Sequence, residues 1–461
     1  MTAAVSSTRG KGGGRIGGRR SNPRHPGRIV AGAFLSVISL GTILLSLPVA
    51  TAQGGRPPVL TALFTATSAL TVTGLVVENT ASYWSGFGEG VILALIQVGG
   101  FGIMFLASLL AVAVFHRLGL RRRLLTQAET GAAGLGDIRG ILVGVAWFTV
   151  VFEGAIAVVL ALKLALGEGE PPLRAAYLGV FHAVSAFNNA GFDLFSDSLV
   201  EFVGDPWIVV PVLVGLIVGG LGFPVLVDLR RSFLGPARWS LHTKLTLYTG
   251  GLLLAAGVGA FLWFEWSNPG TMGPLGWWDK LLTGTFQGAT PRTAGFTTID
   301  YGLANESTLL ITTMLMFIGG GSASTAGGIR LTTFALLGFM MWAELRAEPD
   351  VQLFRRRVQP AAQRQALTVA LVGLTLGVWG TLLLMAVSTS SLPSAMFEAF
   401  SAFGTVGLST GITPDLAAPA QLVLIVLMFL GRIGPWTFAA ALVLRQRRPQ
   451  YRYPEERPII G

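Results

Sequence analysis

Eight apolar runs recur along the whole length of this chain of 461 residues. A helix of roughly 20 apolar residues crosses a hydrocarbon core about 30 Å thick. Lipid offers no hydrogen-bond partners, so such runs cross a membrane as helices. The sequence therefore predicts an all-α polytopic membrane protein with eight spanning helices. The runs cover residues 29–49, 88–115, 139–165, 206–228, 243–265, 307–340, 366–388 and 419–444.

The composition agrees with this class. Hydrophobic residues make up 52% of the chain and charged residues only 12%, whereas a soluble domain carries about 25% charged residues. The chain has no cysteine, which excludes disulfides and thiolate metal sites. The polar stretch 1–27 is predicted to be a disordered cytoplasmic tail, and residues 446–461 are a second cytoplasmic tail.

The net charge of +10 follows a pattern typical of membrane proteins. Basic residues gather in alternate connections, and the intervening connections are acidic or neutral. This alternation places both termini and the basic connections in the cytoplasm. No folded basic surface with readout elements is indicated, which argues against nucleic acid as a partner. The basic clusters include Arg19 and Arg20, Arg121 to Arg123, Arg230 and Arg231, Arg355 to Arg357, and Arg447 and Arg448.

Four shorter, semi-polar segments resemble one another, and each lies between the two members of a pair of apolar runs. They begin near residues 59, 175, 281 and 394. In each, a phenylalanine precedes a glycine by ten residues, or by nine in the third: Phe64 and Gly74, Phe181 and Gly191, Phe286 and Gly295, Phe397 and Gly407. The pattern predicts four membrane–pore-loop–membrane repeats around one pseudo-fourfold pore, over residues 28–116, 117–231, 232–347 and 348–445.

The glycines lie where a potassium selectivity filter needs them. Such a filter replaces the hydration shell of the ion with rings of backbone carbonyls. Glycine reaches the positive φ values that this geometry requires without a steric penalty. The carbonyls expected to bind K⁺ belong to Val72, Thr73 and Gly74; Asn189, Ala190 and Gly191; Thr293, Ala294 and Gly295; and Thr405, Val406 and Gly407.

From about residue 29 to 445 the chain resembles the Trk/Ktr/HKT superfamily of potassium transporters, and within it the bacterial Ktr membrane subunit. The matching motifs run from Thr71 to Leu75, Phe187 to Asp193, Arg292 to Phe296, and Gly404 to Thr410. The resemblance implies potassium uptake across a bacterial cytoplasmic membrane, with Gly74 pointing to potassium over sodium. It also implies a homodimer, a cytosolic nucleotide-binding regulatory ring of the RCK type, and Na⁺ as an activator.

The sixth apolar run alone has a break, rich in residues that weaken helices. The break lies near the membrane midplane, where irregular backbone must line a cavity; the alternative is a glycine-rich face for close helix packing. The resemblance implies an intramembrane gate loop below the filter. Its residues are Gly319, Gly320, Gly321, Ser322, Ala323, Ser324, Thr325, Ala326, Gly327 and Gly328.

Charged residues inside apolar runs are costly and usually face the protein interior. Arg432, in the last run, is expected either to repel cations in a closed state or to bond gate-loop carbonyls. The alternative for Arg432 is that its side chain snorkels to the inner membrane interface. The resemblance supports a gating role. For Glu153, structural and functional roles stay equally open. Lys163 is close enough to the outer interface to snorkel, and His182 is expected to be a hydrogen-bonded packing residue.

The sequence thus predicts a K⁺ channel-like uptake protein and not an enzyme. A secondary transporter, such as a cation-coupled symporter for a different cation or a small solute, is the alternative, but it would not require a fourfold filter repeat. No intramembrane cluster of His, Asp, Glu or Ser suggests catalysis. No nucleotide-binding motif is present, so an organic cofactor is not expected, and a nucleotide would have to act through a separate subunit.

Overall fold

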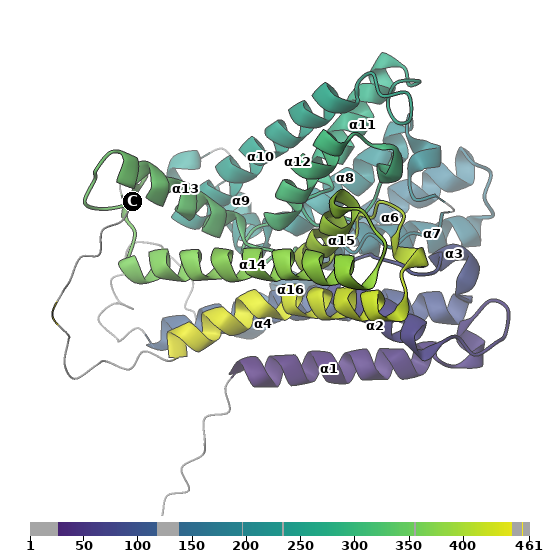
Figure 1. The fold of residues 1–461 in the computed structure, drawn as a ribbon, viewed down its shortest axis with the longest axis horizontal. Coiled ribbons are helices and arrows are strands. Elements are labelled where there is room, and N and C mark those ends of the chain that lie inside the picture. The colour runs from purple at the N-terminus through teal and green to yellow at the C-terminus, as the bar shows by residue number, and fades with distance from the viewer. Residues whose placement is uncertain are drawn as a thin grey trace, which may run out of the picture.

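The computed structural model describes residues 26–117 and 138–444, apart from 196, 233–234 and 355, together with residue 454. This part of the chain is mostly helical (Figure 1), which confirms the predicted helical class. Its only strands are β1 (Gln352–Leu353) and β2 (Arg356–Arg357), which pair antiparallel. The predicted tails lie outside the described residues, except for positions 26, 27 and 454.

Long helices, or pairs of helices, match the eight apolar runs. Among the described residues, α10, α14 and the stretch Val143–Leu166 of α6 are long and apolar enough to cross a membrane. The bent pair α8–α9 makes a fourth candidate. The other runs form shorter apolar helices in the described residues, so eight crossings stay a prediction. The helices are α1 (Pro26–Leu45), α4 (Gly86–Arg117), α6 (Ile138–Leu166), α8 (Pro206–Leu221), α9 (Phe223–Arg231), α10 (Leu241–Glu265), α12 (Glu306–Phe317), α13 (Leu331–Leu345), α14 (Pro360–Val387) and α16 (Ala418–Leu444).

Four shorter helices lie between these long ones in the chain, with starts close to the expected positions. They are α2 (Val59–Thr71), α7 (Pro172–Asn188), α11 (Trp277–Ala289) and α15 (Leu392–Gly404). Proline stands at or just before the first helical positions of α2, α7 and α15, where its fixed φ suits the first turn. Helices α2, α7 and α15 each pack against the long helices on both sides of them in sequence, for example α2 against α1 and α4, and α11 packs against α10.

The remaining helical elements are single turns in the connections. They are α3 (Thr80–Tyr83), η1 (Pro48–Ala50), η2 (Val200–Phe202), η3 (Pro236–Arg238), η4 (Tyr301–Leu303) and η5 (Thr413–Asp415).

Two of the long elements are broken. The break between α12 and α13 contains the predicted residues 319–328. The expected span 206–228 is a bent pair, in which α8 and α9 meet at an angle of 98°. Gly222 at the corner has φ 90°, a value that a residue with a side chain rarely adopts.

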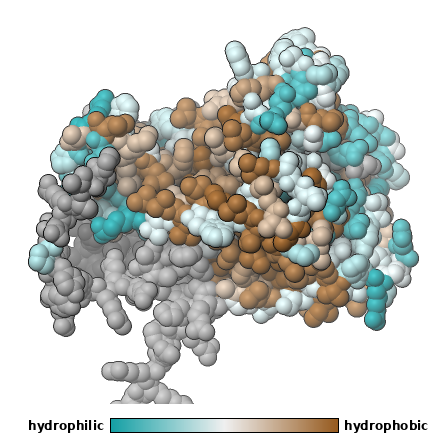
Figure 2. Space-filling model, viewed as in Figure 1, coloured by the Kyte–Doolittle hydropathy of each residue, from teal (hydrophilic) through white to brown (hydrophobic). Residues whose placement is uncertain are grey.

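The surface is apolar over the middle of the molecule. Figure 2 shows hydrophobic residues covering the face on which α14 and α16 run side by side. Large apolar side chains there are strongly exposed, including Leu371, Leu382 and Trp379, the last at 59%. A patch of this extent is unusual on a soluble monomer. Hydrocarbon is the solvent that such a surface fits.

Candidate functional site

Three of the four short helices end in an unusual backbone conformation. Val72, Asn189 and Thr405, the first residues after α2, α7 and α15, have φ values of 55°, 58° and 50°. Each is held by the same pair of backbone hydrogen bonds, such as Val72 N to Ala69 O (3.1 Å) and Thr73 N to Ser68 O (2.8 Å). These bonds satisfy carbonyls that the helix end leaves free.

The third segment reaches the same conformation by another route. Thr290, the residue after α11, stays right-handed, and the positive φ falls at Thr293 (82°). Here Ala294 N donates to Thr290 O (3.0 Å). This shorter path accounts for the phenylalanine-to-glycine spacing of nine residues in this segment.

The predicted glycines follow two residues later, also at positive φ. The values are 93° for Gly74, 69° for Gly191, 75° for Gly295 and 91° for Gly407. The residue between the two positive positions is not left-handed in any segment. Alternation of dihedral sign turns successive carbonyls toward the same side of the chain. Each segment thus has the backbone pattern expected for a row of carbonyl ligands.

The structure brings the four glycines together in a ring. A Cβ on Gly74 would overlap Ala190 O, and one on Gly191 would lie 2.7 Å from Gly295 Cα. A Cβ on Gly295 would lie 2.7 Å from Val406 O, and one on Gly407 would overlap Thr73 O. The segments therefore contact each other in chain order, with the fourth closing on the first. No side chain fits at any of the four positions without displacing backbone.

A second set of residues, which the sequence reasoning missed, fixes the ring from behind. A hydroxyl stands four residues after each pattern phenylalanine, at Ser68, Ser185, Thr290 and Ser401. Ser68 Oγ and Ser401 Oγ accept from Gly74 N (3.1 Å) and Gly407 N (3.2 Å). Ser185 Oγ and Thr290 Oγ1 donate to Phe192 O (2.6 Å) and Phe296 O (2.7 Å). The hydroxyl residue four positions after each phenylalanine is visible in the sequence and could have identified these residues.

A third common position ties down the chain that leaves the ring. The residue after the phenylalanine in α7, α11 and α15 accepts from a backbone amide three residues beyond the glycine. His182 Nε2 accepts from Leu194 N (3.2 Å), Gln287 Oε1 from Thr298 N (2.7 Å), and Glu398 Oε1 from Thr410 N (3.0 Å). The expected packing role of His182 is thereby confirmed, since its Nδ1 also donates to Leu178 O (2.7 Å).

A cavity of about 450 Å³ opens on the glycine side of the ring. All four glycines line it, as do the carboxylates of Asp193, Asp197 and Asp300. Burial, with the Asp197 carboxylate nearby, raises the pKa of Asp193 to about 7 although Ser198 donates a hydrogen bond to it. Acidic groups at the mouth of a cleft raise the local concentration of cations. In the described part of the chain, no group of three His, Cys, Asp or Glu side chains could hold a metal ion.

The glycine-rich break lies on the other side of the ring. Residues 318–330 join α12 to α13 and fold back on themselves, with Gly319 N donating to Ile329 O (2.8 Å). Thr325 Oγ1 donates to Asn189 Oδ1 (3.1 Å), at the start of the second ring segment. A Cβ on Gly327 would overlap Thr405 Oγ1, at the start of the fourth. These two segments occupy opposite sides of the ring.

Two arginines bind carbonyls of this loop. Arg432, on α16 and 1% exposed, donates from Nη1 to Thr325 O. Arg330 Nη1 donates to Ala326 O (2.5 Å). Arg432 does not snorkel: it points to the loop, and its Nε and Nη2 have no partner among the described residues. Two guanidinium groups therefore lie next to the start of the ring segments.

The second repeat also holds the loop, which was not expected from the sequence. Gly321 N donates to Gly220 O (2.8 Å), and Thr325 N to Gly219 O (3.4 Å). Across the α8–α9 corner, Phe223 N donates to Ala323 O (3.4 Å). The two broken elements thus pair through their backbones, because each break frees groups that the other can satisfy.

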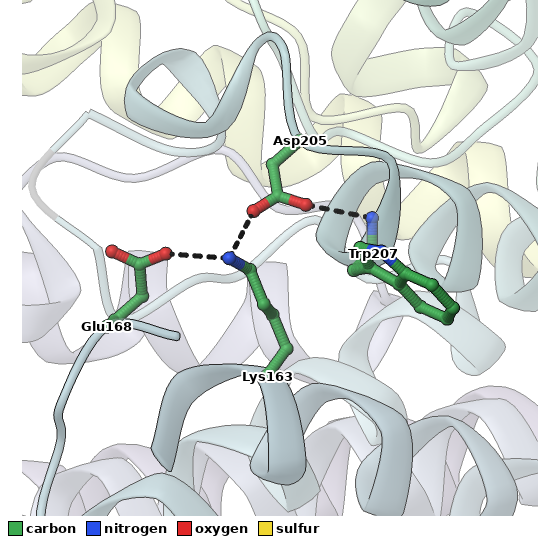
Figure 3. A network of polar contacts seen from close by, with 4 residues as sticks. All are labelled: Lys163, Glu168, Asp205 and Trp207. Atoms are coloured by element: carbon green, nitrogen blue, oxygen red, sulfur yellow. Dashed lines mark hydrogen bonds and ion pairs between the residues drawn. The ribbon is translucent and has the colours of Figure 1, made fainter. Parts of the chain in front are cut away.

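The two remaining charged residues have different surroundings. Lys163, near the end of α6, lies between Glu168 (3.1 Å) and Asp205 (2.8 Å), as Figure 3 shows. Asp205 also accepts from Trp207 N (2.9 Å), capping α8. Lys163 is therefore an anchor at a helix end, whereas Glu153, at 8% exposure, is buried.

The apolar surface, the spanning helices and the convergence of four polar-backbone segments define the class as α-helical membrane proteins. The chain belongs to the TrkH family, described as cation transport protein, whose model matches residues 21–452. It is 40% identical to the Ktr system potassium uptake protein B of Bacillus subtilis, over 95% of this chain and 97% of that protein.

Two other relatives and one solved structure extend the comparison. The Ktr system potassium uptake protein B of Vibrio alginolyticus is 38% identical, covering 94% of each chain. The potassium/sodium uptake protein NtpJ of Enterococcus hirae is 35% identical, covering 95% of this chain and 97% of its own. The potassium transporter TrkH of Vibrio parahaemolyticus matches with a TM-score of 0.70 at 20% identity, covering 91% of this chain and 85% of that one. This last likeness shows the fold.

Proposed function

We propose that this chain takes up K⁺ across a bacterial cytoplasmic membrane through a pore at the centre of the four-segment ring. The observation that carries the proposal is the contact of four glycines at positive φ in chain order. A closed ring of backbone carbonyls can replace the hydration shell of K⁺. The filter ligands are the carbonyls of residues 72–74, 189–191, 293–295 and 405–407. Relatives at 34–40% identity are named potassium uptake proteins.

A potassium-uptake-deficient bacterial strain tests this function. The chain should restore growth on low potassium, and bulky substitution of Gly74 or Gly295 should abolish the rescue. Purified protein in liposomes should show K⁺ flux down the electrochemical gradient, because a pore needs no coupled ion. Unimpaired rescue by both glycine variants would reject the filter.

Residues 319–328, with Arg432, form the proposed gate. The loop contacts the second and fourth segments on opposite sides of the ring, so it lies across the path that an ion would take. Replacing Arg432 by alanine should raise K⁺ flux in liposomes, because it removes the bond to Thr325 O and a positive charge. Deleting part of the loop should likewise raise K⁺ flux in liposomes, and unchanged flux in both variants would contradict the gate.

The regulatory partners follow from the family rather than from this site. A homodimer bound to a cytosolic nucleotide-sensing RCK-type ring is proposed because two close relatives are named as Ktr system proteins. Flux in liposomes with and without such a ring, at several nucleotide concentrations, would measure the regulation.

A second candidate function differs in the ion. The name of the Enterococcus hirae relative includes sodium as well as potassium, which favours Na⁺ either as a second transported ion or as an activator. A coupled symporter would carry K⁺ against its gradient when a Na⁺ gradient is imposed across the liposome membrane. A pore would not. Flux measured with each gradient separately distinguishes the two.

A further inference from the structure

The buried carboxylate of Glu153 joins three helices behind the second ring segment. Glu153 Oε1 accepts from Asn188 Nδ2 (2.9 Å), and Oε2 accepts from Gln97 Nε2 (3.3 Å). Asn188 Nδ2 also lies 2.9 Å from Gln97 Oε1 and from Val184 O, so its two hydrogens are shared among three acceptors. The three side chains come from α6, α7 and α4, and together they form what is called here the carboxyamide cluster.

The cluster acts on the residue next to the ring. Asn188 is the last residue of α7, is fully buried, and immediately precedes Asn189 with its φ of 58°. On the α4 side there is no free space, since a Cβ on Gly100 would lie 2.7 Å from Asn188 Cγ. A shift of the Asn188 side chain must therefore move the backbone that carries the Asn189 carbonyl.

A carboxylate is the group that this position requires. An ionised carboxylate only accepts hydrogen bonds, so both amides must turn their NH₂ groups toward it. A neutral amide at position 153 could face either way and would leave one donor unmatched. Burial of a carboxylate is costly unless its oxygens accept hydrogen bonds. Only the amide orientation that supplies these bonds is therefore stable.

The corresponding positions in the other segments are built differently. They hold Thr71, whose Oγ1 donates to Thr67 O (2.7 Å), Arg292, whose Nη1 donates to Gly250 O (3.0 Å), and Gly404. Within the described residues, a carboxylate clamp at this register belongs to the second segment. The second segment also departs from Thr-Val-Gly, with the filter sequence Asn-Ala-Gly.

We infer that Glu153 is a positioning residue for ion selectivity: through Asn188 it holds the Asn189 carbonyl in place on the K⁺ path. The inference rests on the proposed filter function. Loosening the clamp lets the carbonyls close around a smaller ion. The consequence is a lower K⁺-to-Na⁺ flux ratio with little change in folding.

The experiment compares K⁺ and Na⁺ fluxes in liposomes for the full chain and four variants. Glu153→Gln should lower the K⁺-to-Na⁺ flux ratio by about tenfold, the scale of losing a hydrogen bond to a charged group. Gly100→Ala perturbs Asn188 from the α4 side, so it should lower the ratio as well. Glu265→Gln is the matched control, because Glu265 is also buried but bonds Asn268, Thr271, Asn305 and Thr308 away from the ring.

The double variant Glu153→Gln with Asn188→Asp separates positioning from charge. It exchanges the carboxylate and the amide, and with the Gln97 amide turned over, all three bonds of the cluster can form again in mirror arrangement. Only the Asn188 bond to Val184 O (2.9 Å) is lost. A positioning role therefore predicts recovery of most of the flux ratio.

Each outcome decides the inference. A normal ratio in Glu153→Gln, or no recovery in the exchange variant, would overturn it. If Glu153→Gln does not fold, the ratio of Gly100→Ala decides in its place. Failure of the proposed function would look different, because the unaltered chain would then show no K⁺-selective flux at all.

Discussion

At the scale of single residues, the ring depends on residues held in an unfavourable left-handed backbone conformation. Three of the four residues that open the ring segments at positive φ, namely Val72, Thr293 and Thr405, are β-branched. The left-handed region costs an L-residue roughly 1–2 kcal/mol. The helix-end bonds and the buried hydroxyls behind the segments offset this cost. Strain that the surroundings maintain in this way marks a functional position.

Gly74→Ser should reduce the K⁺-to-Na⁺ selectivity of liposome flux by about tenfold, because a Cβ there meets Ala190 O and costs about 1–2 kcal/mol in backbone strain alone. Gly54→Ser is the control. Gly54 also has a positive φ (73°), but a Cβ there would meet nothing within 4 Å. Equal selectivity losses in the two variants would contradict a specific role for the ring.

Uptake from low K⁺ should fall as the external pH drops through 7. The pKa of Asp193 is raised to about 7, so its carboxyl gains a proton below that pH and no longer attracts cations to the cavity. One charge at about 8 Å in water contributes about 0.5 kcal/mol, which corresponds to about a twofold change in uptake. Initial rates measured between pH 6 and 8 should show this step, and Asp193→Asn should abolish it. A step that persists in Asp193→Asn would assign it to another group.

At the scale of elements, the two broken helices are joined to each other by backbone hydrogen bonds. The corner between α8 and α9 bonds the loop between α12 and α13 at Gly219, Gly220 and Phe223. A helix break normally leaves buried polar groups unpaired. Here each break satisfies the other, so the loop cannot move without changing the α8–α9 corner. The proposed gate is then tied to the second, third and fourth repeats together.

Gly222→Ala should raise K⁺ flux without changing ion selectivity. Gly222 has φ 90°, and a Cβ there would lie 2.6 Å from Ser322 O in the loop. The substitution therefore displaces the loop but leaves the ring intact, and a gain of about tenfold follows from the 1–2 kcal/mol of strain. Gly220→Ala serves as the control, because its Cβ would meet only the Asn189 side-chain amide, at the ordinary contact distance of 3.4 Å. Unchanged flux in Gly222→Ala would separate the corner from gating.

At the scale of the whole molecule, the arrangement fits a protein surrounded by lipid. The exposed surface over the long helices is apolar (Figure 2), and the ionised groups of Lys163, Glu168 and Asp205 gather near the ends of α6 and α8 (Figure 3). The cavity that all four glycines line opens on one side of the ring, and the loop lies on the other. One side of the ring thus faces a cavity, and the other faces the loop.

Cysteine labelling can fix the orientation, because the natural chain contains no cysteine and is its own unlabelled control. Ser391 and Arg364 are exposed residues near opposite ends of α14. With both termini in the cytoplasm, a membrane-impermeant maleimide should label Ser391→Cys in intact cells. It should label Arg364→Cys only after the membrane is opened. Labelling of both in intact cells, or the reverse pattern, would refute this orientation.

The sequence by itself determined the features that depend on local chemistry. Apolar length indicated the long helices, the four similar semi-polar segments indicated the short helices, and the four glycines indicated the positive φ that was found. The glycine-rich stretch 319–328 predicted a break because these residues weaken a helix in any context. Glu153 and Arg432 stood out because charge inside an apolar run needs a partner.

Only the tertiary structure decided which partners those residues have. Contacts between segments more than 100 residues apart, such as Gly407 with Thr73, have no signature in a single sequence. The break at Gly222 was missed, because one glycine does not outweigh an apolar run until the α12–α13 loop offers bonds to the freed backbone. The role of Glu153 was open for the same reason: a carboxylate shows that a partner exists, but only packing brought Asn188 and Gln97 to it.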